Sequence, residues 1–153
     1  MSTQAQPYAA TRGGSQARKR VLFLCLGNAC RSQMAEGFAR AYGEDVIVPA
    51  SAGLTPAMAV ADDTIRAMEE KDIDLRSHFP KSWLHLHRAP FDLVVNLSGF
   101  EVPLQITAPV RVWKVADPFR APYEEHCRVR DQIENLVMGL ILEFRREQKR
   151  QRV

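Results

Sequence analysis

Short apolar runs alternate along the chain with segments in which apolar residues recur every three or four positions. Four runs have the length of strands that are buried on both faces: residues 21–24, 46–48 (ending near 51–53), 91–97 and 110–113. Four segments are predicted to be helical: residues 31–43, 61–71, 81–88 and 123–144. Strands and helices therefore alternate through the first half of the chain, and the last helix is the longest.

Strands that alternate with helices pair in parallel through right-handed crossover connections. The sequence therefore predicts an α/β fold, a small doubly wound four-stranded parallel sheet with helices on both faces. Ligands bind at the carboxyl ends of the strands in such sheets. The residues that follow each strand are thus the first place to look for chemistry.

Both ends of the chain are basic, whereas the segment between them is acidic. Of the 21 Lys and Arg, nine lie in residues 1–20 and 145–153, which hold only one of the 18 acidic residues, so residues 21–144 carry a net charge of −5. We expect a disordered basic extension at 1–20, a domain at 21–145 and a solvated basic tail at 146–153. No aromatic residue is interleaved with the tail charges, which argues against nucleic acid as a partner.

The composition is that of one globular domain. The chain has 153 residues, of which 46% are hydrophobic and 25% are charged. Its three cysteines are too few for a disulfide framework, and no apolar run approaches the ~20 residues that a membrane span needs. The first residues also lack the apolar stretch of a signal peptide. We therefore expect a soluble, cytoplasmic protein with no membrane partner.

The segment after the first predicted strand begins at Cys25, continues LGNACRS and leads into a helix. Backbone N–H groups of a loop between a strand and a helix N-terminus bind anions. Gly27 permits close approach, Asn28 tolerates a left-handed conformation, and Arg31 presents a fork of donors to an oxyanion. Cys25 is thereby predicted to be a thiolate nucleophile, steadied by the Ser32 hydroxyl. The alternative, that Cys25 is only a small buried apolar residue, does not account for the residues that follow it.

Residues 21–32, VLFLCLGNACRS, resemble the phosphate-binding loop of the low-molecular-weight protein tyrosine phosphatases, whose superfamily includes arsenate reductases of the same fold. The resemblance extends over most of residues 21–145 and includes Ser51-Ala52-Gly53, the strand at 91–97 and Asp117-Pro118. It implies a phosphatase I-like fold that needs no metal or cofactor. It also implies a phosphoprotein or a small phosphoester as the substrate.

The resemblance assigns roles to individual residues. Cys25 matches the nucleophile, Arg31 the phosphate-binding arginine and Asp117 the general acid. Three residues match those that hold the loop by hydrogen bonds: Asn28, Ser32 and Ser51. The candidates for substrate contacts are Leu26, Gly27, Asn28, Ala29, Cys30, Ser32 and Phe119.

The sequence Asp117-Pro118-Phe119 has a second interpretation. An Asp followed by Pro is also typical of a helix start, and Phe119 is also a candidate core residue at the foot of the last helix. Beside a thiolate nucleophile, however, a carboxylic acid can protonate a leaving alkoxide or phenoxide. An aromatic ring next to that acid can stack on an aryl substrate.

Cys30 and the histidines carry weaker signals. The resemblance implies that Cys30 can trap an oxidised Cys25 as a reversible disulfide, and the alternative is a small loop filler. The histidines match no metal-ligand spacing, so we expect surface or hydrogen-bonded residues rather than a metal site: His78, His85, His87 and His126.

Hydrolysis of phosphotyrosine or another aryl phosphate, through a phosphocysteine intermediate, is the function that the sequence favours. The Asp117-Pro118-Phe119 segment suits an aryl ester. Reductases of the superfamily that couple to thioredoxin carry two further cysteines near the end of the third strand. Here that region has Ser98 and Gly99, and Cys127 on the last helix has no partner nearby in sequence.

Two alternatives remain. Residues 31–37 and 128–131 look more like the reductase branch, which leaves open an arsenate reductase that uses an external small thiol. A non-catalytic phosphate-binding module is the third hypothesis. The intact nucleophile, arginine and acid argue against it, because a pure binder needs no reactive thiol.

Overall fold

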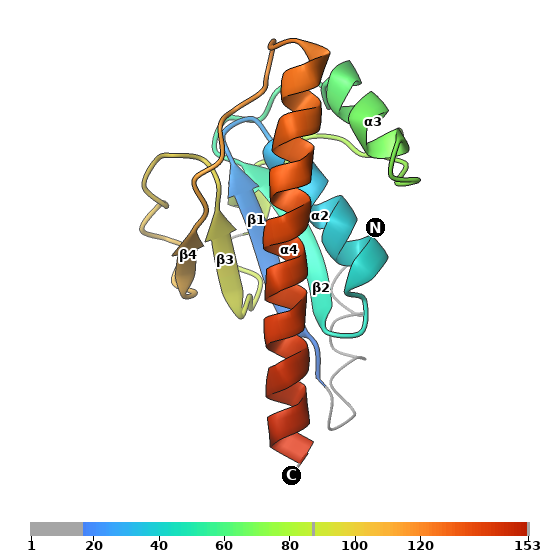
Figure 1. The fold of residues 1–153 in the computed structure, drawn as a ribbon. Helices are drawn as coiled ribbons and strands as arrows, with labels where there is room; N and C mark the ends of the chain where they lie inside the picture. Colours follow the sequence, from blue (N-terminus) through green and yellow to red (C-terminus); the bar gives the residue numbers. More distant parts are fainter. Residues whose placement is uncertain (1–16, 87, 153) are drawn as a thin grey trace.

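The computed structural model describes residues 17–86 and 88–152. Its elements follow in the order β1 (Lys19–Cys25), α2 (Arg31–Tyr42), β2 (Ile47–Gly53), α3 (Asp62–Glu69), the 3₁₀ helix η2 (Trp83–His85), β3 (Leu93–Asn96), β4 (Val110–Val112) and α4 (Tyr123–Arg152). Figure 1 shows α4 running the full length of the molecule, beside the sheet.

The four strands form one parallel sheet in the order β2-β1-β3-β4. In the register of the central strand, Phe23 lies opposite Ser51 on one side and Val95 on the other. The order of β2 before β1 requires the chain to return across the sheet after the second strand, which is a doubly wound topology. The predicted α/β fold is confirmed.

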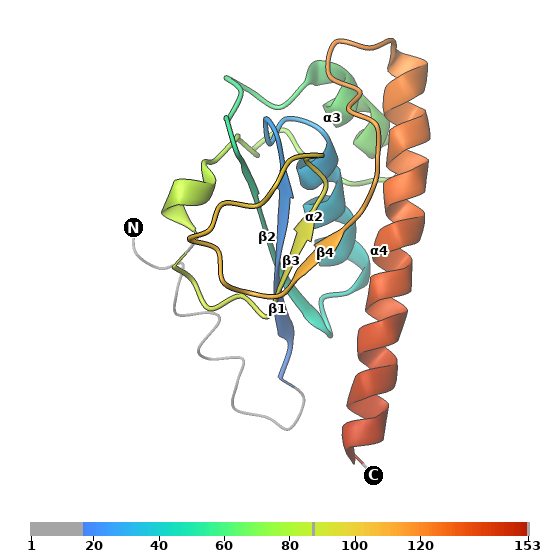
Figure 2. The same ribbon diagram turned by 90° about the vertical axis from the view of Figure 1, so that its left-hand side faces the viewer.

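The sheet has a core on each face. Alternate residues of β1 point to opposite faces, and the large face buries Val21 and Phe23 against α2 and α4. The other face buries Leu22 and Leu24 under η2 and the loop that joins β3 to β4. Figure 2 shows the sheet between these two layers, with α4 on one side and η2 on the other. The apolar part of β1, residues 21–25, is therefore buried because both faces of the sheet are covered there.

Several predicted boundaries differ from the observed ones. β1 begins at Lys19, inside the segment expected to be a disordered extension, and residues 1–16 lie outside the described ones. Only Trp83–His85 of the predicted helix at 81–88 is helical, as one 3₁₀ turn. Because residue 87 is not described, the histidine predicted to be a surface residue there is outside the structure as well.

The expected basic tail is helical, since α4 continues to Arg152. Arg, Lys, Gln and Glu are good helix formers, so a charged segment can extend a helix without burying an apolar face. Two ion pairs link the end of α4 to the rest of the fold: Arg145 with Asp45 at 2.8 Å and Lys19 with Glu147 at 3.9 Å. Among the described residues, no helix is both long enough and apolar enough to cross a membrane.

The end of β2 lies directly beneath the loop that follows β1. The Gly53 N–H donates to Lys81 O at 2.7 Å, and the next residue, Leu54, donates to Cys25 O at 3.0 Å. A Cβ atom at Gly53 would lie 2.8 Å from Leu26 O and 2.9 Å from Asn28 N. The backbone of the loop therefore approaches β2 so closely that only glycine fits.

Replacing Gly53 with Ala is expected to lower the free energy of unfolding by about 1–3 kcal/mol, because loop backbone must shift to make room. Gly139→Ala is the matched control, since a Cβ there meets nothing within 4 Å. That control is expected to be neutral or stabilising by about 0.5–1 kcal/mol, as alanine is favoured within a helix. Urea unfolding of both variants measures the difference. Equal stability of Gly53→Ala and the unmodified protein would contradict the close approach.

Candidate active site

The loop between β1 and α2 wraps around the thiol of Cys25. Asn28 adopts a left-handed conformation with φ of 52°, and its backbone N–H donates to Cys25 Sγ at 3.2 Å. Asparagine is among the few residues other than glycine that adopt this conformation at low cost. The turn thus directs a backbone donor at the sulfur, as the sequence predicts for an anion-binding loop.

Two side chains continue the hydrogen-bonding around the sulfur. Cys25 Sγ lies 2.8 Å from Ser32 Oγ, and the Asn28 amide donates from Nδ2 to the same oxygen at 2.7 Å. Because the amide occupies the hydroxyl oxygen as a donor, the hydroxyl proton is free to point to the sulfur. The Ser32 hydroxyl is therefore placed to donate to the Cys25 sulfur. Asn28 and Ser32, the predicted loop supports, both lie in this network.

Arg31 is anchored beside the loop with part of its guanidinium free. Its side chain is buried, and Nη1 donates to the carbonyls of Leu97 at 2.5 Å and Val115 at 3.1 Å. Nη2 lies 3.4 Å from Asp117 Oδ2. Nε is buried without a hydrogen-bond partner among the described residues. A buried donor without a partner is costly, so Nε is available to a bound oxyanion.

Asp117 lies at the mouth of the loop rather than at a helix start. α4 begins only at Tyr123, so the interpretation of Asp117 as a helix cap is wrong. Its carboxylate accepts from Phe119 N at 3.1 Å, which closes a local turn. The Phe119 side chain is 44% exposed, too much for the core residue considered as an alternative. The irregular segment before α4 therefore presents both side chains to solvent at the site.

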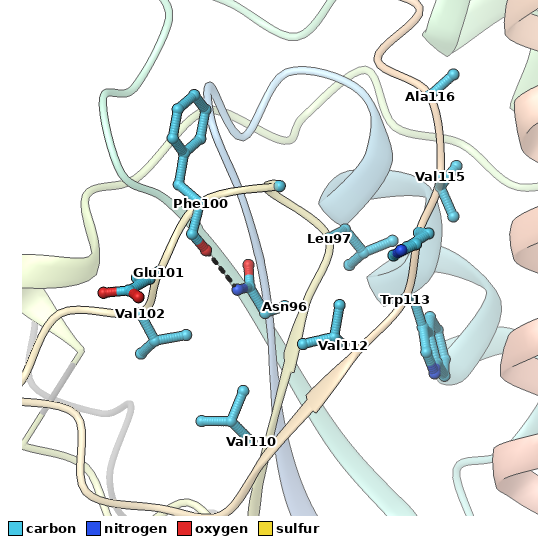
Figure 3. A pocket seen from close by; sticks show the side chains of 12 residues that line it. Asn96, Leu97, Phe100, Glu101, Val102, Val110, Val112, Trp113, Val115 and Ala116 are labelled. Atoms are coloured by element: carbon cyan, nitrogen blue, oxygen red, sulfur yellow. Dashed lines mark hydrogen bonds between the residues drawn. The ribbon is translucent and has the colours of Figure 1, made fainter.

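A small cavity of about 150 Å³ contains the sulfur and the acid. It is lined by Cys25, Leu26, Gly27, Ala29, Cys30, Arg31, Thr55, Ala57, Asp117 and Phe119. Except for Asn28 and Ser32, which lie behind the sulfur, every residue expected to contact substrate lines this cavity. A larger groove of about 910 Å³ runs along β3 and β4, and Figure 3 shows its apolar walls of Val102, Val110 and Val112. Its lining includes neither Cys25 nor Asp117, so the smaller cavity is the candidate site.

The surroundings of Cys30 favour its neutral thiol, although the residue lines the cavity. Burial raises the pKa of the Cys30 thiol to about 12, although a hydrogen bond with the Thr64 side chain opposes the change. Thr64 Oγ1 also bonds His126 Nδ1 at 2.9 Å, and all three side chains are buried. Burial lowers the pKa of His126, which favours the neutral ring in this contact. A thiol with so high a pKa is a poor nucleophile near neutral pH.

Ser98 and Cys127, the two positions that bear on a cysteine relay, make structural contacts. Ser98 stands where relay cysteines occur in thioredoxin-coupled reductases; its Oγ donates to Asn96 Oδ1 at 2.7 Å and accepts from Phe100 N at 3.0 Å. These bonds close the turn after β3. Cys127 is partly buried on α4, and its side chain is hydrogen-bonded to Tyr123.

Ser51 was predicted to hold the loop, but it reaches the loop only through α2. Its hydroxyl donates to Glu36 Oε1 at 2.5 Å, and Glu36 also pairs with Arg40 at 2.8 Å. The physical reason is the position of Ser51 two residues before the end of β2, opposite the buried face of α2. It therefore positions the helix that follows the loop, rather than the loop itself.

The residues that support Asn28 from outside the loop were not predicted from the sequence. Gln33 donates from Nε2 to Asn28 Oδ1 at 3.1 Å and bonds His78 Nδ1 through its own carbonyl oxygen at 2.9 Å. Lys81 contacts the same Asn28 oxygen. His78 and His126 thus have hydrogen-bond partners, as predicted. Gln33 follows directly after Arg31-Ser32 and is buried. A polar residue at this position, at the start of a helix that packs on the sheet, is the one sequence signal of this support.

Comparisons with known proteins agree with this geometry. The model of the family described as low molecular weight phosphotyrosine protein phosphatase matches residues 20–103. A glutaredoxin arsenate reductase of Synechocystis is 35% identical over 127 residues, which is 80% of this chain and 96% of the relative. Arsenate reductase 1 of Bacillus cereus is 37% identical over 120 residues, covering 76% and 89%.

Solved structures give the same result. An arsenate reductase in its phosphate-binding state superposes with a TM-score of 0.76 at 32% identity, covering 82% of this chain and 98% of that one. An arginine phosphatase from Geobacillus stearothermophilus also reaches 0.76, at 23% identity and with 86% and 96% coverage, which is a likeness of fold. With its cysteine loop, anchored arginine and matching relatives, the chain belongs to the low molecular weight phosphotyrosine protein phosphatase family.

Proposed function

We propose that this enzyme reduces arsenate, with Cys25 as the nucleophile and an external small thiol as the reductant. The observation that carries the proposal is the state of the three cysteines. Cys25 lies in the oxyanion loop, whereas Cys30 is buried with a raised pKa and Cys127 lies on α4, outside the lining of the cavity. The curated relatives at 35–37% identity are arsenate reductases, which supports the alternative left open by the sequence better than aryl phosphate hydrolysis.

In the first step the Cys25 thiolate attacks arsenic. A tetrahedral arsenate binds to the loop N–H groups and to Arg31 Nε, which has no other partner in the described structure. The S–As bond forms as one As–O bond breaks, and Asp117 donates a proton so that the oxygen leaves as water. Arsenic is still As(V) after this step.

The second step transfers two electrons and needs a second thiol. An external thiol attacks Cys25 Sγ, an S–S bond forms, and the electron pair of the S–As bond stays on arsenic, which leaves as arsenite, As(III). A further external thiol then reduces the mixed disulfide and frees Cys25. The buried surroundings of Cys30 and the serine at position 98 support an external thiol over an internal one.

Hydrolysis of an aryl phosphate is the second candidate. It is favoured by the half-exposed ring of Phe119, which lines the cavity next to Asp117 and can stack on a phenyl group. The first step is the same, with phosphorus in place of arsenic. The two functions differ in the second step. In hydrolysis, water activated by Asp117 attacks the phosphocysteine.

Turnover of the two substrates by one preparation separates the candidates. Arsenite production is measured with glutathione, with glutathione plus glutaredoxin and with thioredoxin, and p-nitrophenyl phosphate hydrolysis is measured in parallel. We expect arsenite that depends on glutathione. Aryl phosphate turnover with no arsenite under any thiol would overturn the proposal in favour of the second candidate.

Replacing Cys25 with Ser is expected to abolish turnover of both substrates while leaving oxyanion binding in place. The backbone donors and Arg31 remain, but a serine hydroxyl is a far weaker nucleophile without a strong base. Isothermal titration with arsenate measures binding in the same sample that is assayed. Residual turnover within about tenfold of the unmodified enzyme would exclude a covalent mechanism at this residue.

Asp117→Asn tests the general acid. The amide oxygen can still accept from Phe119 N, so the turn is retained while the proton donor is lost. We expect kcat on alkyl phosphates and on arsenate to fall by about 10²–10⁴-fold. The loss on p-nitrophenyl phosphate is expected to be much smaller, because its leaving group needs little protonation. Unchanged rates on a poor leaving group would show that another group supplies the proton.

A further inference from the structure

The amide oxygen of Asn28 receives an unusual number of donors from outside the active-site loop. Oδ1 accepts from Gln33 Nε2 at 3.1 Å, from the backbone N–H of Lys81 at 2.8 Å and from Lys81 Nζ at 3.5 Å. One residue, Lys81, thus approaches this oxygen with both its main chain and its charge. Neither the loop motif nor its resemblance includes this lysine.

The Lys81 ammonium is held in place rather than free in solvent. Nζ donates to Phe79 O at 3.0 Å and lies 5.1 Å from the centre of the Phe79 ring. Burial lowers the pKa of Lys81, and the Glu36 carboxylate acts in the opposite direction. Two oxygen acceptors, an aromatic face and a nearby carboxylate offset part of this effect of burial and hold the ammonium in place.

We propose that Lys81 is a positioning residue whose fixed positive charge stabilises the Cys25 thiolate through the side chains of Asn28 and Ser32. The proposal rests on Cys25 being the nucleophile of the proposed function, but it concerns either substrate equally. It assigns Lys81 no contact with substrate.

The direction of each hydrogen bond supports this role. Lys81 polarises the Asn28 carbonyl, which makes the Asn28 Nδ2–H a stronger donor to Ser32 Oγ at 2.7 Å. Ser32 in turn donates to Cys25 Sγ at 2.8 Å. All donors therefore point from the ammonium toward the thiolate, and hydrogen bonds aligned in this way strengthen one another.

Other charges near the two ends of this series of hydrogen bonds do not replace Lys81. Near Lys81, the Glu36 carboxylate is bonded to Ser51 and paired with Arg40. The Arg40 charge also repels the Lys81 ammonium. His78 faces the same region, and burial lowers its pKa, so it is mainly neutral at neutral pH.

Near Cys25 the charged groups are Arg31 and Asp117, which lie 3.4 Å apart and offset each other. Arg31 is also the group that an oxyanion engages, so its charge is shared with the substrate. Lys81 contacts the loop through the Asn28 side chain and is not among the residues that line the substrate cavity. Its effect on the thiolate therefore persists when the cavity is filled.

The test measures alkylation of Cys25 by iodoacetamide as a function of pH, read by peptide mass spectrometry so that Cys30 and Cys127 are scored separately. Lys81→Met removes the charge but keeps the backbone N–H on Asn28. We expect the pH midpoint of Cys25 alkylation to rise by about half to one unit, less than for the loss of a cation in direct contact, because Lys81 acts through two intervening side chains. Lys81→Arg is expected to stay near the unmodified midpoint, because it restores the charge.

Lys19→Met is the matched control. It removes the same charge at the opposite end of β1, seven residues long, and is expected to leave the midpoint unchanged. Lys81→Gln provides a second neutral variant should the methionine disturb folding, which circular dichroism reports. An unchanged midpoint in the neutral variants, or an equal rise in Lys81→Arg, would overturn the proposal. Because alkylation needs no substrate, an enzyme that makes no arsenite would contradict the proposed function and leave this result intact.

Discussion

A buried sulfur enclosed by hydrogen-bond donors is the constraint on which the rest of this structure depends. Cys25 has little contact with water, since the residue is 2% exposed, so any negative charge on its sulfur must be stabilised by protein donors instead of hydration. The Asn28 N–H and the Ser32 hydroxyl do so. Each of these donors is fixed by a further bond, and the fold provides the partners. The loop is consequently arranged for an anion before any substrate arrives, which is the preorganisation that electrostatic catalysis requires.

The same arrangement explains how one family serves different reactions. In the proposed reaction, binding of a tetrahedral oxyanion and attack by Cys25 use only the loop, Arg31 and Asp117. What happens next depends on the attacking group that reaches the sulfur or its adduct: water gives hydrolysis, and a thiol gives reduction. In this chain Ser98, which lies outside the loop motif, closes a turn, and Cys30, which lies inside it, is hydrogen-bonded to the Thr64 side chain, so neither position supplies the second thiol. Similarity of the loop alone therefore does not determine the reaction.

The sequence predicts the part of the site that is local. The residues from Cys25 to Ser32 form one turn whose chemistry follows from their spacing, and the apolar run before them identifies the buried strand. Contacts between distant segments are different. The Leu97 and Val115 carbonyls that anchor Arg31, and the lysine beside Asn28, lie 50 residues or more from their partners and show no pattern of their own. The apolar periodicity predicts that the last helix ends near residue 144, whereas α4 continues to Arg152. Periodicity indicates which residues are buried, but helix formation also depends on helix propensity.

The most direct test of the central claim, that Cys25 is the one thiol that reacts and that its partner comes from outside, is the covalent state of the enzyme during turnover. The enzyme is mixed with arsenate and glutathione, quenched in acid and analysed by peptide mass spectrometry without reduction. The account predicts glutathione attached to Cys25, with Cys30 and Cys127 unmodified, and none attached when arsenate is left out. An internal disulfide that joins Cys25 to either of the other cysteines during turnover would contradict it.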